Sequence, residues 1–97
     1  MRRFGRVDRG APIELVLYTR ASCHLCDDMK AEIARAGVAQ LFTLVEVDVD
    51  SDPKLAAEHG LSIPVLALDG RALFKGRLTA EALRRKLGRR IRARRAR

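Results

Sequence analysis

Residues 14–26 read ELVLYTRASCHLC, a short apolar run followed by two cysteines three positions apart. The run from Glu14 to Thr19 is rich in strand-forming residues and predicts a buried strand. Ser22 is a candidate helix N-cap. Apolar residues then recur at helical spacing, namely Cys26, Met29, Ile33 and Ala36, and Gly37 follows them. The stretch therefore predicts a strand, a short connection and a helix that begins at the cysteines.

The same signals continue along the chain. We expect strands at 42–49, 64–68 and 72–75, a short helix between Asp52-Pro53 and Gly60, an Asp69-Gly70 hairpin turn, and a last helix from Thr79. Leu83, Leu87 and Ile91 extend the pattern of this last helix toward the arginines of the C-terminus, although Gly88 weakens it. The resulting β-α-β-α-β-β-α order predicts an α/β fold with a four-stranded mixed sheet and helices on both faces.

The length and charge of the chain indicate one domain with basic ends. Its 97 residues fit a single core. Residues 1–10 hold four arginines and one aspartate, residues 89–97 hold six arginines, and residues 11–88 are nearly neutral. We therefore predict a basic N-terminal extension (1–12), a domain (13–88) and an arginine-rich tail (89–97).

The chain carries no recognisable targeting segment. Arg2 and Arg3 are not followed by the apolar stretch of an export signal, and no apolar run is long enough to span a membrane. Two cysteines are too few for a disulfide-stapled secreted scaffold. We expect a protein of the reducing cytoplasm whose cysteines serve chemistry.

Cysteines at a helix start have a physical use in disulfide exchange. The partial positive charge of a helix N-terminus favours a thiolate, which is the nucleophile of that reaction. Cys23 is expected to be the exposed attacking sulfur, and Cys26, one turn further on the core face, the resolving one. Arg20 and a protonated His24 favour the Cys23 thiolate, whereas Asp27 and Asp28 oppose it.

Two metal-binding interpretations of the cysteine pair remain open. A zinc site needs four ligands, and the only other soft donors are His24, which lies between the cysteines, and the isolated His59. An iron-sulfur cluster bridging paired subunits is the second alternative. We predict no resident metal or tightly bound cofactor.

With these residues in view, a family resemblance emerges. The segment from Tyr18 to Cys26 resembles the active-site segment of glutaredoxins, and Ser62-Ile63-Pro64 resembles their Thr-Val-Pro loop. With the Asp69-Gly70 hairpin and Asp48-Val49-Asp50, residues 13–88 particularly resemble the small glutaredoxin-like proteins of bacteria, which have the thioredoxin fold. The resemblance implies thiol-disulfide exchange in redox homeostasis, with Cys23 as nucleophile and Cys26 as resolver.

The resemblance also implies roles for residues outside the cysteine pair. Pro64 would be a cis-proline facing the dithiol, and Ile63 would offer backbone hydrogen bonds to a bound peptide or to glutathione. His24 and Leu25 replace the Pro-Tyr that is common in the family. Arg77 replaces an acidic residue, within a segment that keeps one glycine of a usual pair. Arg20, Lys75 and Arg77 are nevertheless candidates to attract the carboxylates of glutathione, which is the expected cosubstrate.

The expected partners are a disulfide-containing protein or glutathione, with a reductase as electron source. The arginine tail is most simply a solvated segment, because no aromatic residue is interleaved with its arginines for base stacking. Nucleic acid, acidic proteins and anionic membrane surfaces are its alternative partners. Two other functions stay open, an iron-sulfur or metal carrier and a redox-sensing binding module with a basic tail.

Overall fold

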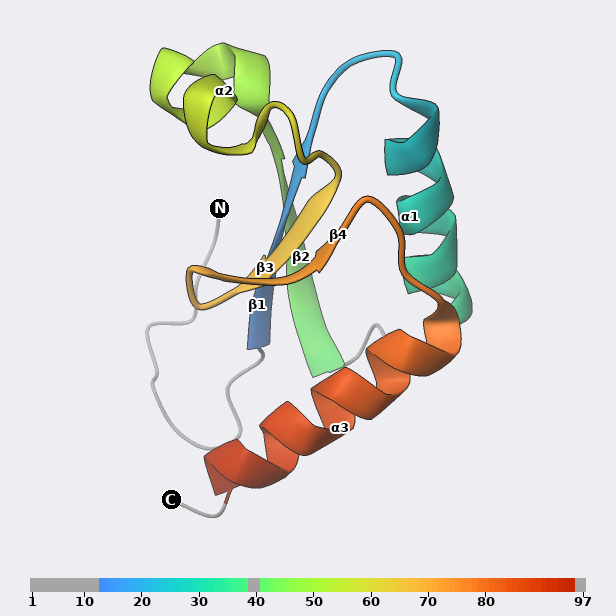
Figure 1. The fold of residues 1–97 in the computed structure, drawn as a ribbon. Helices are drawn as coiled ribbons and strands as arrows, with labels where there is room; N and C mark the ends of the chain where they lie inside the picture. The colour runs from blue at the N-terminus through green and yellow to red at the C-terminus, as the bar shows by residue number, and fades with distance from the viewer. Residues whose placement is uncertain (1–12, 39–40, 96–97) are drawn as a thin grey trace.

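The computed structural model describes residues 13–38 and 41–95. The predicted basic extension, residues 1–12, lies outside the described residues. The observed element order is the predicted one (Figure 1). The elements are β1 (Ile13–Thr19), α1 (His24–Arg35), β2 (Phe42–Asp48), a 3-10 turn (Val49–Ser51), α2 (Pro53–His59), β3 (Val65–Leu68), β4 (Arg71–Lys75) and α3 (Ala80–Arg95).

The strands form one four-stranded sheet in the order β2-β1-β3-β4. β1 and β2 are parallel, with Ile13 opposite Phe42, whereas β1 pairs with β3, and β3 with β4, in antiparallel fashion. The turn between β3 and β4 is formed by Asp69 and Gly70, both with positive φ (53° and 77°). Glycine adopts that conformation freely and aspartate tolerates it, which is why the pair predicted the hairpin. The mixed sheet is thus confirmed.

One face of the sheet carries the main core. Alternate residues of β1 point to this face, where they meet the apolar sides of α1 and α3. The core residues are Ile13, Leu15, Leu17, Met29, Ile33, Ala36, Leu66, Leu68, Leu78, Ala80, Leu83 and Leu87. The helical spacing that predicted the inner side of α1 is confirmed, because Cys26, Met29, Ile33 and Ala36 are all buried.

The opposite face of the sheet is contacted by α2. Tyr18 points away from the main core and stacks on His59, the last residue of α2, with ring centroids 4.1 Å apart. The predicted start of α2 is confirmed, since Asp52 accepts a hydrogen bond from the Lys54 amide (2.9 Å) and Pro53 opens the helix. Helices therefore lie on both faces of the sheet (Figure 1).

The last helix extends beyond the predicted domain boundary at residue 88. α3 passes through Gly88 without a break and continues to Arg95. The domain boundary predicted at residue 88 thus falls inside a helix, and most of the arginine tail is helical. No helix within the described ranges has the length and apolar character required to cross a membrane.

Candidate functional site

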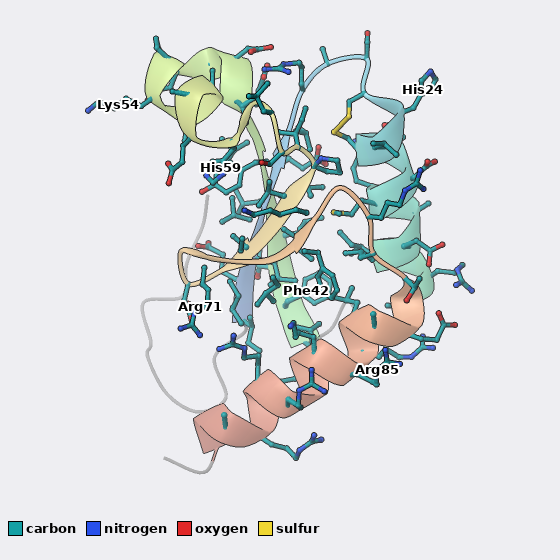
Figure 2. The ribbon with its side chains drawn as sticks, viewed as in Figure 1. His24, Phe42, Lys54, His59, Arg71 and Arg85 are labelled. Carbon is teal, nitrogen blue, oxygen red and sulfur yellow. A yellow bond between two sulfur atoms is a disulfide. The ribbon has the colours of Figure 1, made fainter. Side chains whose placement is uncertain are left out.

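The two cysteines lie at the start of α1, shortly after the end of β1, and they form a disulfide (Figure 2). Their Cα atoms are 5.2 Å apart. The helix N-cap is Cys23 and not Ser22, so the predicted cap was wrong by one residue. Ser22 instead adopts a left-handed conformation (φ 59°) in the turn before the helix. That turn leaves Cys23 in extended conformation with its sulfur directed at the first helical turn.

The two sulfurs occupy different environments. Cys26 is 2% exposed, whereas Cys23 is half-buried. The backbone N–H of Cys26 donates a hydrogen bond to Cys23 Sγ across 3.1 Å. The same N–H would stabilise a Cys23 thiolate in the reduced protein, because helix-terminal amides and the helix dipole favour negative charge. Cys23, which was expected to be exposed, is thus half-buried, whereas Cys26 lies on the core side of the helix as expected.

Pro64 lies beside the segment that carries the dithiol. The Ile63–Pro64 peptide bond is cis, the isomer that the family resemblance implied. Tyr18 pairs with Val65 in antiparallel register. Pro64, the residue before Val65, therefore lies next to the C-terminal end of β1, where the dithiol segment begins. Pro64 is buried and Ile63 half-buried, and the Pro64 carbonyl accepts a hydrogen bond from the Gly76 amide (2.7 Å). The segments before β3 and after β4 are therefore joined next to the dithiol segment.

Arg20 is occupied by partners within the chain. Its guanidinium makes two hydrogen bonds to the Asp50 carboxylate (2.9 and 3.2 Å) and donates a third to the Gly60 carbonyl (3.3 Å). The hydrogen bond and charge of Asp50 raise the Arg20 pKa above its ordinary value. Arg20 was predicted to attract substrate carboxylates and to favour the Cys23 thiolate. Its observed contacts tie the dithiol segment to the 3-10 turn and to the C-terminal end of α2.

The remaining predicted binding residues with charged or titratable side chains are His24, Lys75 and Arg77, and all three are exposed. His24 is exposed, and its side chain points away from the disulfide (Figure 2). Lys75 and Arg77 are exposed at the end of β4 and in the connection to α3. Within the described residues, neither has an ion pair.

A groove of about 690 Å³ runs between α1 and the connection from β4 to α3. Leu25 and Asp28 line it near the cysteines, and Arg77 lines it on the opposite side. Its further lining residues are Met29, Ala31, Glu32, Arg35, Phe74, Gly76, Leu78, Thr79 and Ala82. The lining of this groove thus offers a ligand both a cation, Arg77, and an exposed leucine, Leu25.

Charged side chains at one end of the groove join α1 to α3. Glu32 accepts hydrogen bonds from Arg35 and from the backbone N–H of Ala80. These bonds, that from Arg35 foremost, lower the Glu32 pKa. Neither this contact nor the Arg20–Asp50 pair was predicted, because each joins residues at least 30 positions apart.

In residues 13–38 and 41–95, no three His, Cys, Asp or Glu side chains are grouped closely enough to hold one metal ion.

Comparison with protein families gives one match that covers most of the chain. The model described as "Glutaredoxin-like domain (DUF836)" matches residues 14–88. Uncharacterized proteins from Mycobacterium tuberculosis and Mycobacterium bovis are 35% identical to this chain in an alignment 63 residues long that covers 60% of this chain. The aligned part spans 65% of the length of these mycobacterial relatives.

Solved structures share the fold. A structural-genomics target protein from X. campestris is 36% identical, with a TM-score of 0.66 over 76% of this chain and 95% of its own. A protein from Nitrosomonas europaea is 26% identical, with a TM-score of 0.64 over 84% of this chain and 94% of its own.

Proposed function

Because this chain belongs to the glutaredoxin-like domain family, we propose that it is a thiol-disulfide oxidoreductase that reduces protein disulfides or glutathione mixed disulfides. The observation that carries the proposal is the asymmetry of the Cys23–Cys26 pair. Cys23, half-buried at the helix N-cap, accepts a hydrogen bond from a backbone N–H through its sulfur. The partner cysteine, one turn later, is buried in the core. This asymmetry supplies one nucleophile for the substrate and one for product release.

The reaction proceeds in two exchange steps. In the reduced protein, the Cys23 thiolate attacks one sulfur of the substrate disulfide, whose S–S bond breaks and whose other sulfur leaves as a thiolate that takes up a proton. Cys26 then attacks Cys23 Sγ, and its proton passes to the second substrate sulfur as that sulfur departs. This step closes the Cys23–Cys26 disulfide and releases the second substrate thiol. Two electrons have passed to the substrate, and glutathione or a dithiol reductase returns them to the protein.

Two features of the surface favour a protein substrate. The large apolar side chains exposed in the described part of the chain are Leu25 and Leu61. Leu25 lies between the cysteines, and Leu61 lies three residues before the proline of the cis bond. Exposed apolar side chains next to a reactive group are suited to contact with a partner protein, because the centres of protein interfaces are largely apolar. A glutathione substrate would be attracted differently, through its carboxylates, by the cations Lys75 and Arg77.

Three forms of the protein test the proposal. The wild type, Cys23→Ser and Cys26→Ser are assayed on a protein disulfide and on a glutathione mixed disulfide, each with glutathione or thioredoxin reductase as electron source. We expect Cys23→Ser to be inactive and Cys26→Ser to accumulate a mixed disulfide through Cys23, detectable by mass spectrometry. Full turnover by Cys23→Ser would refute the proposal. The ratio of the two substrate activities identifies the preferred substrate.

A further inference from the structure

The outer side of α3 is a surface that the dithiol chemistry does not use. Residues 82–97 contain eight arginines, one lysine and no acidic residue. Leu83 and Leu87 are almost fully buried and Ile91 is half-buried against the core. Since this apolar side fixes the rotation of the helix, it also fixes which residues face outward from α3.

Three of these arginines form what we call the basic ridge. Arg85, Arg89 and Arg92 are exposed and follow one another at intervals of four and three residues, which places them along one side of the helix. Within the described residues, none of the three has an ion pair or a hydrogen bond from its side chain. Neighbouring cations are engaged differently: Arg84 donates to the Ala36 carbonyl (3.1 Å) and pairs with Glu81, and Lys86 lies over the Phe74 ring.

The geometry of the ridge is suited to a regular array of phosphates. Its guanidiniums project from successive turns, with about 4.5–6 Å of rise along the helix axis from one arginine to the next. Duplex nucleic acid carries one negative charge per roughly 1.7 Å of its axis, so the row of arginines faces a dense array of phosphates. Arginine, with a planar fork that binds phosphate through two hydrogen bonds, is the cation used almost exclusively here.

Other anionic partners fit the basic ridge less well. A helix that binds a membrane surface inserts its apolar side, and the apolar side of α3 is inside the core. Protein interfaces use apolar or aromatic anchors, but the exposed leucines Leu25 and Leu61 are not on α3. Single strands are held by stacking on aromatic rings, and the aromatic residues of the described chain lie on strands of the sheet.

We propose that the basic ridge binds the phosphate backbone of duplex nucleic acid without sequence selectivity. The ridge runs from the middle of α3 toward its C-terminus, whereas the dithiol lies at the N-terminus of α1, and these two parts of the fold lie far apart (Figure 1). A bound duplex therefore leaves Cys23 open to substrate. The consequence is a disulfide-exchange protein that is concentrated on nucleic acid.

The test measures dissociation constants for fluorescent duplex DNA and duplex RNA of about 20 base pairs, in salt from about 50 to 200 mM. Two double variants remove the same charge. Arg85→Gln/Arg89→Gln changes the ridge, and Lys54→Gln/Arg71→Gln changes exposed cations of α2 and β4. We expect the ridge variant to bind at least about tenfold more weakly and to lower the slope of log affinity against log salt by about 2. The matched variant should retain near-native binding.

Several outcomes would overturn the proposal. Equal weakening by the two double variants would mean that net charge alone is responsible. Binding to anionic vesicles but not to duplexes would assign the ridge to membranes, and equal affinity for a single strand would remove the duplex preference. Circular dichroism verifies that both variants are folded. Cys23→Ser/Cys26→Ser should bind duplexes as the wild type does, so this proposal can fail or succeed independently of the oxidoreductase activity.

Discussion

The carboxylate of Glu32, on the third turn of α1, accepts a hydrogen bond from the backbone N–H of Ala80 at the start of α3, with 2.8 Å between the two atoms. The first N–H groups of a helix have no partner inside the helix, so a side chain from elsewhere must satisfy them. Thr79 satisfies another through its contact with the Ala82 amide (3.1 Å). Helix α3 therefore begins where α1 holds it, beside the groove between α1 and the connection from β4 to α3.

Replacing this carboxylate should weaken the protein in a pH-dependent way. Glu32→Gln is expected to lower the melting temperature at pH 7. Because the pKa of Glu32 is lowered from its ordinary value of 4.5 in the folded protein, its contribution is fully present above that value and is lost as the pH falls through the lowered pKa. Thermal melts from pH 7 to pH 3 should show the difference between wild type and variant shrinking below pH 4.5. Glu58→Gln, at an exposed site of α2, is the control, and a gap that is constant with pH would contradict the assignment.

The pair of Arg20 and Asp50 should act as a positioning device for the dithiol segment. If Arg20 acts by holding Asp50, then Asp50→Asn should slow disulfide exchange about as much as Arg20→Gln does. The rate of exchange in the double variant should then be no lower than in either single variant. If instead Arg20 binds substrate, Asp50→Asn releases it and should preserve activity. The values of kcat and KM for the four forms distinguish the two roles.

His24 should tune the redox properties of Cys23 only slightly. Its side chain points into solvent, away from the disulfide, where water and salt screen its charge. We expect His24→Ala to lower the reduction potential a little, because the reduced thiolate loses a nearby cation. The measurement is a redox titration against glutathione, supported by the pH dependence of Cys23 alkylation in the Cys26→Ser background. A higher potential in His24→Ala would contradict this expectation.

Arg77 should affect one substrate class more than the other. Arg77→Gln removes an exposed cation from the groove and is expected to raise KM for a glutathione mixed disulfide about two- to fivefold, the scale of one solvent-exposed ion contact. The KM for a protein disulfide should change less, and the glutathione effect should fade in high salt. Lys54→Gln is the control that loses the same charge elsewhere. An equal change of KM in that variant would contradict a specific role of Arg77 in binding glutathione.

Two glycines should respond oppositely to alanine. Gly88 lies inside α3, and an added Cβ would meet only the Arg92 side chain, at 3.5 Å. Gly88→Ala should therefore stabilise the protein by about 0.5–1 kcal/mol through helix propensity. Gly60→Ala would press a Cβ against the Ala56 carbonyl and should destabilise. Thermal and denaturant unfolding measure both, and a stabilised Gly60→Ala would contradict the packing described.

The order of the elements could be predicted from sequence because each leaves a local signal. Examples are the proline that opens α2, the Asp69-Gly70 turn and the repeated leucines of α3. The N-cap of α1 was predicted wrongly because serine is in general the better capping residue. In the structure Ser22 lies in a left-handed turn, and the sulfur of Cys23 caps the helix. Capping preferences say little about a position that the disulfide constrains.

The site was predictable only in part. The cysteine pair is a local motif, so its position at a helix start followed from residues 14–26 alone. The partners of Arg20 and Glu32 come from segments 30 or more residues away and depend on how the strands and helices pack. A single sequence shows that these residues are charged, but it does not show which opposite charges or backbone groups will meet them.

The disulfide closes a loop of only four residues within one turn of α1. The conformational freedom that a crosslink removes from an unfolded chain grows with the loop that it closes, so this crosslink is among the least restrictive a chain can have. The crosslink itself therefore contributes only modestly to the resistance of the protein to unfolding, which depends mainly on the apolar core between the sheet, α1 and α3.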